Sequence, residues 1–145
     1  MLPKWHIFFG AIFAGILWYF AQDINPFYIV LVFFASFLID LDHYFNAVRK
    51  TGKLGLNHAL EYHKNLAEKE NAELKKGVKN KESFHIFHTI EFHILILIIG
   101  LAWTPFFYIF LGMIFHSLLD IFTMLYMNNL YRREFFFFNW LRKKF

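Results

Sequence analysis

Histidine and aspartate recur in this sequence at spacings that bring two side chains to one face of a helix. Residues three or four apart lie on the same side of an α-helix. Three pairs have this spacing: His116 with Asp120, His85 with His88, and Asp40 with His43. Inward-pointing pairs of this kind, supplied by neighbouring helices, form the metal sites of helix bundles. The spacing therefore predicts a metal centre.

The expected ligands offer only nitrogen and oxygen atoms. The predicted ligand set is His6, Asp40, His43, His85, His88, His116 and Asp120. Such donors suit a divalent ion, with zinc as the first choice and manganese or iron as alternatives. The chain has no Cys, which excludes thiolate ligands, a Cys nucleophile and a disulfide scaffold. Glu91 and Asp42 are candidate general bases, although Asp42 points away from Asp40 and His43 if one helix continues through all three.

The segments that carry these residues are apolar enough to cross a bilayer. The 145 residues, one domain in length, are 58% hydrophobic, include 22 Phe and are 18% charged, against about 25% charged in ordinary soluble domains. A spanning helix needs about 17–25 mostly apolar residues. The sequence predicts an all-α integral membrane protein with four transmembrane helices, at about 5–21, 27–45, 84–102 and 106–127. Short Pro-containing turns at 23–26 and 103–105 make two antiparallel hairpins.

The positive charges indicate how such a bundle would be oriented. All 15 Lys and Arg lie before the first span, in the loop 46–83 or in the tail 128–145, and the two short turns have none. The positive-inside rule then places both termini and the loop in the cytoplasm of a multi-pass inner-membrane protein. The net charge of +4 is thus a topology signal, and we expect no nucleic acid partner.

The remaining polar residues have simpler interpretations. The loop 46–83 is expected to be partly helical and amphipathic, with His58 and His63 on its surface. Asp23, His93 and Glu134, taken singly, are expected to cap helices or meet lipid headgroups. The Phe-rich tail with Trp140 is typical of an interfacial anchor. By contrast, the predicted ligands lie in the cytoplasmic half of all four spans, where ionisable groups are costly and indicate function.

These motifs resemble a family of predicted membrane-bound metal-dependent hydrolases, small inner-membrane proteins of bacteria and archaea. Three motifs carry the resemblance: His-x-x-x-Gly at His6–Gly10, Asp-x-Asp-His at Asp40–His43, and Gly-x-x-x-His-x-x-x-Asp-x-x-Thr at Gly112–Thr123. The resemblance covers the four spans but not residues 46–80, and it implies a bound metal and a hydrolytic reaction. The family's middle motif carries an Arg after its first His, where this chain has Ile86. An Arg there could hold a phosphate or carboxylate, so its absence bears on the substrate.

The leading hypothesis is therefore a hydrolase at the cytoplasmic leaflet that acts on a lipid or lipid-linked phosphoester through a metal-activated water. The same residues could instead serve a transporter or channel for metal ions or protons. A transporter or channel needs a path across the whole membrane, but the outer halves of the predicted spans carry no ionisable group. Two further hypotheses are a haem or di-iron redox protein and a non-catalytic protein stabilised by its metal. The sequence leaves open the number of ions, the bond cleaved and whether the chain forms an oligomer.

Overall fold

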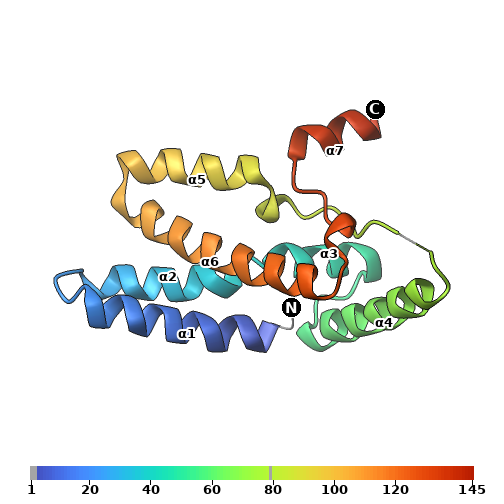
Figure 1. The fold of residues 1–145 in the computed structure, drawn as a ribbon, viewed down its shortest axis with the longest axis horizontal. Coiled ribbons are helices and arrows are strands. Elements are labelled where there is room, and N and C mark those ends of the chain that lie inside the picture. Colours follow the sequence, from blue (N-terminus) through green and yellow to red (C-terminus); the bar gives the residue numbers. More distant parts are fainter. Residues whose placement is uncertain (1–2, 79) are drawn as a thin grey trace.

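Two helical hairpins form the body of the protein. The computed structural model describes residues 3–78 and 80–145, and every regular element in those ranges is a helix. Helix α1 (Pro3–Phe20) pairs with α2 (Pro26–Leu38), and α5 (Ile90–Ala102) pairs with α6 (Thr104–Tyr126) (Figure 1). Helix α2 also packs against α6, which joins the two hairpins. The predicted all-helical fold is thus confirmed.

Proline and asparagine set the hairpin turns where the sequence predicted them. Asn25 caps α2, because its side-chain oxygen accepts a hydrogen bond of 2.9 Å from the Phe27 N–H, and Pro26 occupies the first turn. Pro105 likewise lies in the first turn of α6, where a missing N–H costs nothing. Both turns lie at one end of the bundle, whereas the tail and the helices of the 46–83 loop gather at the other end (Figure 1).

Small residues allow α1 and α6 to approach α2 closely at the level of Ser36. A Cβ atom added to Gly112 of α6 would lie only 2.7 Å from the Ala35 Cβ, and one added to Gly10 of α1 would lie 3.0 Å from the Ser36 Cβ. Glycine at such crossings lets helix backbones meet, as is common in membrane bundles. This crossing fixes the depth at which His6 and His116 face each other.

Two predicted spans differ from the observed helices. The segment 27–45 is divided, because α2 ends at Leu38 and α3 (Leu41–Thr51) begins after Asp40. The segment 84–102 is helical only from Ile90, where Thr89 caps α5; before it lies the short 3₁₀-helix η1 (Ile86–His88). Helix α5 is therefore about 20 Å long, against a hydrocarbon core of about 30 Å.

The four predicted spans are therefore only partly supported. Among the described residues, two helical segments are long and apolar enough to cross a membrane, Pro26–Thr51 and Thr104–Tyr126. The first of these counts α2 and α3 together. Helix α5 is apolar but shorter.

The end of the bundle opposite the two hairpin turns, which we call the polar end, is formed by the loop 46–83 and the tail 128–145. Helix α3 stops at Gly52, whose φ of 71° is the left-handed conformation that glycine adopts easily. Helix α4 (Leu56–Lys75) then packs against α3, so the loop is partly helical as predicted. After α6 the chain forms the 3₁₀-helix η2 (Leu130–Arg132) and ends in α7 (Phe137–Lys144).

Candidate metal centre

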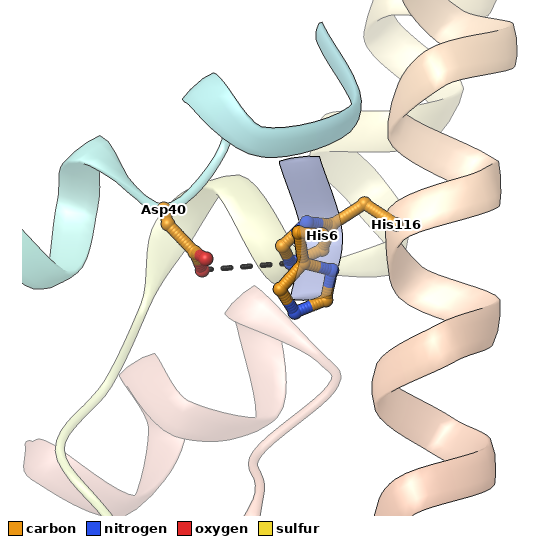
Figure 2. A group of neighbouring side chains, drawn as sticks. All are labelled: His6, Asp40 and His116. Atoms are coloured by element: carbon orange, nitrogen blue, oxygen red, sulfur yellow. Dashed lines mark ion pairs between the residues drawn. The ribbon is translucent and has the colours of Figure 1, made fainter. Parts of the chain in front are cut away.

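Helices α1 and α6, the α2–α3 junction and η1 bring the predicted ligands together at the polar end of the bundle. Figure 2 shows three of them: the rings of His6 and His116 lie against each other, and Asp40 reaches toward His116. The ring centroids of His6 and His116 are 3.8 Å apart, with an interplanar angle of 17°. Both side chains are almost completely buried.

Four donor atoms lie around the two imidazoles of His88 and His116, and we call this group the inner site: Nε2 of His88, Nε2 of His116, Oδ1 of Asp40 and Oδ2 of Asp120. The two imidazole nitrogens are 3.2 Å apart. Oδ1 of Asp40 lies 3.5 Å from each of them. Oδ2 of Asp120 lies 3.6 Å from the His116 nitrogen and 4.0 Å from that of His88.

These separations fit a bound divalent ion. Bonds of about 2.0 Å in tetrahedral geometry place neighbouring ligand atoms about 3.3 Å apart, close to the observed range of 3.2 to 4.0 Å. A lone pair on each nitrogen and the charge on each carboxylate suit the same cation. His6 lies next to the set, with its Nε2 atom 3.2 Å from Oδ1 of Asp120.

The opposite nitrogen of each inner-site imidazole is held by a hydrogen-bond acceptor. Nδ1 of His116 donates to the carbonyl oxygen of Ser36 at 2.9 Å, and Nδ1 of His88 lies 3.0 Å from Oδ2 of Asp42. A proton on Nδ1 leaves Nε2 as a lone-pair donor facing the site. Metal-binding histidines in proteins are oriented by such contacts.

Asp42 faces the cluster instead of pointing away. It would point away from Asp40 and His43 only if one helix continued through all three residues, but α2 ends before Asp40 and α3 starts anew. Besides its contact with His88, Asp42 accepts a hydrogen bond from the Phe87 N–H at 3.2 Å. Asp42 thus orients an inner-site histidine and lies within the candidate centre.

His43 and His85 lie against each other and beside the two aspartates. Their ring centroids are 3.7 Å apart, and Nε2 of His43 lies 3.6 Å from Oδ1 of Asp40. Nδ1 of His85 faces Oδ1 of Asp42 at 3.5 Å. All seven predicted ligands therefore fall within one continuous cluster.

Glu91 does not join this cluster. Its carboxylate accepts hydrogen bonds from the backbone N–H groups of Phe137, at 2.9 Å, and Phe138, at 3.3 Å. These donors belong to the first turn of α7, so Glu91 supplies the negative group that a helix N-terminus favours. Its observed contacts are structural.

Two histidines outside the predicted ligand set have specific internal contacts, although His93 was expected at a helix cap or the headgroups and His63 at the loop surface. His93 is buried between α5 and α6, with Nδ1 2.9 Å from the Thr89 carbonyl oxygen and Nε2 3.0 Å from the Ser117 hydroxyl. His63 of α4 is half-buried and donates to the carbonyl oxygen of His43 at 3.0 Å. His58 is exposed, as predicted.

Arg133 is the residue of the centre that sequence reasoning missed. Its Nη1 atom donates to Oδ2 of Asp120 at 2.6 Å, and its Nε atom donates to Glu82 at 2.8 Å. Burial alone would lower the pKa of Arg133, but the carboxylates of Asp120 and Glu82 raise it above its ordinary value. The guanidinium therefore stays charged and neutralises part of the acidic cluster.

Glu134, the next residue, ties the tail to the rest of the polar end. Its carboxylate accepts from Lys143 at 2.8 Å, Lys81 at 3.0 Å and Asn139 at 2.7 Å. The hydrogen bond from Lys143, followed by those from Lys81 and Asn139, lowers the pKa of Glu134 to about 2. Glu134 was predicted to cap a helix or to meet headgroups, whereas its observed partners are three side chains of the loop and the tail.

An apolar groove of about 250 Å³ lies beside the cluster. Its lining comes from α2, η1, α5 and α6 and includes Ile39, Phe87 and Met113. Ile39 and Phe87 directly precede Asp40 and His88 in the chain. The groove therefore adjoins the backbone that carries two of the candidate ligands.

Comparisons with protein-family models, with curated proteins and with solved structures found no match to this chain. The donor atoms and their distances are therefore the basis for assigning a function. A set of two imidazoles and two carboxylates can hold a divalent ion, and such an ion can polarise a bound substrate.

Proposed function

We propose that this protein is a membrane-embedded metal-dependent hydrolase that acts at the cytoplasmic leaflet on a lipid or lipid-linked phosphoester. The observation that carries the proposal is the close approach of two imidazole Nε2 atoms to each other and to a carboxylate oxygen of Asp40 and of Asp120, at separations of 3.2 to 4.0 Å. The resemblance to membrane-bound metal-dependent hydrolases leads to the same reaction class.

His88, His116, Asp40 and Asp120 would hold the ion, and zinc is the first choice for this donor set. A divalent ion bound there would polarise the phosphoester and make a nucleophile available from water at neutral pH. The chain's own residues prepare the site. Ser36 and Asp42 orient the two histidines, and Arg133 limits the repulsion between the carboxylates.

The surface of the helices supports a membrane location. Large apolar side chains are exposed on several of them, for example Trp18 of α1 at 58%, Leu101 of α5 at 78% and Phe122 of α6 at 68%. Extended exposed apolar surface marks a membrane or protein contact. The Lys and Arg residues follow the opposite pattern, because they lie outside the apolar segments, as the positive-inside rule expects of a cytoplasmic side.

The groove supports a substrate with an alkyl chain. It is apolar, and its lining residues Ile39 and Phe87 adjoin Asp40 and His88. A lipid whose chain occupied the groove would bring its headgroup to the inner site. Burial of each methylene group contributes about 0.8 kcal/mol to binding, so the groove favours lipid over water-soluble phosphoesters.

Elemental analysis and a lipid assay test the proposal together. Full-length protein, purified in detergent without chelator, is expected to contain at least one equivalent of divalent metal and to release product from lipid phosphoesters. Asp120→Ala is expected to lose both properties. Asp23→Ala, in the exposed α1–α2 turn, is the matched control and should keep both. Metal-free wild-type protein, or equal turnover by Asp120→Ala, would contradict the proposal.

A further inference from the structure

A second group of potential ligands lies outside the inner site. We call it the outer site, and it consists of Asp42, His43 and His85, each of which offers a donor atom within 4.8 Å of the other two. Asp42 and His43 come from the start of α3, and His85 directly precedes η1. The group is therefore assembled from two segments that are far apart in the sequence.

Two buried atoms of the outer site lack a hydrogen-bond partner among the described residues: Oδ1 of Asp42 and Nδ1 of His85. They face each other at 3.5 Å, which is beyond the usual length of a hydrogen bond. The side chains of both residues are more than nine-tenths buried. Buried polar atoms in proteins nearly always have a partner, so this pair requires an explanation.

The second ring nitrogen of His85 also has a polar partner. Nε2 lies 3.2 Å from the Ser83 hydroxyl, which in turn accepts a hydrogen bond of 2.6 Å from the Asn46 side chain. This contact accommodates a proton on Nε2, and in that tautomer Nδ1 carries a lone pair. That lone pair then points at a carboxylate oxygen, an arrangement that a cation between the two stabilises. Metal-ligating histidines have such a polar partner on their second nitrogen.

The outer site is linked to the inner site through the two aspartates. Asp42 presents Oδ2 to His88 and Oδ1 to His85, so it contacts one histidine of each site. Oδ1 of Asp40 lies 3.6 Å from Nε2 of His43 and 3.5 Å from the inner-site nitrogens. Asp40 therefore lies between the two groups.

We propose that the outer site binds a second divalent cation, held by Asp42, His43 and His85 and coupled to the inner site through Asp40. Paired ions bridged in this way can act on both the attacking and the leaving oxygen of a phosphoester. That use of the pair rests on the proposed function, whereas binding of the second ion does not.

Metal titration of the full-length protein in detergent tests this proposal. The protein is stripped with chelator, dialysed and titrated with Co²⁺, followed by visible absorbance, and zinc content is measured after reloading. Wild-type protein is expected to bind two equivalents per chain, whereas His85→Ala binds one. His93→Ala, which removes a buried histidine outside both sites, is the matched control and should bind two.

The outcomes separate the second ion from the hydrolase. One equivalent in both wild-type protein and His85→Ala would overturn the outer site and leave the proposed function standing. Two equivalents without any lipid hydrolysis would support the outer site and contradict the proposed function. The wild-type titration decides the stoichiometry even if His85→Ala fails to fold, since it needs no variant.

Discussion

The Arg133 guanidinium donates to Oδ2 of Asp120 at 2.6 Å, which joins the tail of the chain to a carboxylate of the inner site. Both side chains are more than nine-tenths buried. Removing one partner of a buried ion pair leaves an uncompensated charge, which costs about 3–5 kcal/mol. We therefore expect Arg133→Met to lower the free energy of unfolding of the chelator-treated protein by about that amount, measured by denaturant titration in detergent.

Zinc should restore more stability to Arg133→Met than to the wild-type protein, because a cation at the inner site replaces the lost charge beside Asp120. Arg142→Met, in the exposed part of α7, is the control. It should change neither the stability without metal nor the gain in stability on adding zinc. Equal stability of Arg133→Met and wild-type protein without metal would mean that the pair does not hold the tail in place.

Gly112 sets the distance between α6 and α2 one turn before His116. A methyl group there would overlap the Val32 carbonyl oxygen and the Ala35 Cβ, and overpacking of this kind costs about 1–3 kcal/mol. We expect Gly112→Ala to lower the stability by this amount and to weaken zinc binding, as measured by competition with a chromophoric chelator. Gly15→Ala, where nothing lies within 4 Å, should instead raise stability by about 0.5–1 kcal/mol. Similar effects of the two substitutions would show that the close approach is unimportant.

The parts of the centre that the sequence could predict are those set by one continuous helix. His116 and Asp120 share a face of α6, and their 3.6 Å contact follows from their spacing alone. The hairpin turns at Pro26 and Pro105 were predictable for a similar reason, since proline restricts the backbone locally. The helical fold was therefore predictable from the long apolar segments and from the prolines that separate them.

The rest depends on breaks in the backbone that local sequence does not mark. The change of direction between Leu38 and Leu41 contains neither Gly nor Pro, yet it turns Asp42 into the cluster. Arg133 reaches Asp120 because the chain reverses after α6, with Asn128 in the left-handed region at a φ of 51°. The spacing of His85 and His88 predicts a shared face of an α-helix, but these residues lie at a 3₁₀-helix.

Glu91 offers a test of which carboxylates belong to the centre. Its hydrogen bonds to the N–H groups of Phe137 and Phe138 predict that Glu91→Gln loosens α7 but leaves the metal content unchanged. Limited proteolysis of the tail and elemental analysis measure the two effects separately. If Glu91→Gln instead abolishes hydrolysis with an unchanged cleavage pattern, then Glu91 acts in the reaction as a general base.

The stability of the tail should depend on pH through Glu134. The pKa of this group is lowered from its ordinary value of 4.5 to about 2 in the folded protein. Because the pKa is lowered in the folded protein, ionised Glu134 contributes stability above pH 4.5. This contribution is lost as the pH falls toward 2. We expect a change in tryptophan fluorescence over this pH interval, because the Trp140 ring stacks on the Phe84 ring with their centroids 4.2 Å apart. In Glu134→Gln this change should be absent, and a transition of full size in that variant would assign it to another group.

The groove predicts a substrate preference that can be separated from catalysis. Ile109→Trp, in the lining, would fill part of the space and displace an alkyl chain. Loss of contact with two methylene groups, at about 0.8 kcal/mol each, raises KM about 15-fold. We expect that increase for a long-chain lipid phosphoester and no increase for a short water-soluble one, with kcat unchanged for both. Leu118→Trp, on an exposed position of the same helix, should leave both KM values unchanged. An equal increase for the two substrates in Ile109→Trp would show that the groove does not receive the chain, because damage to the inner site affects both substrates alike.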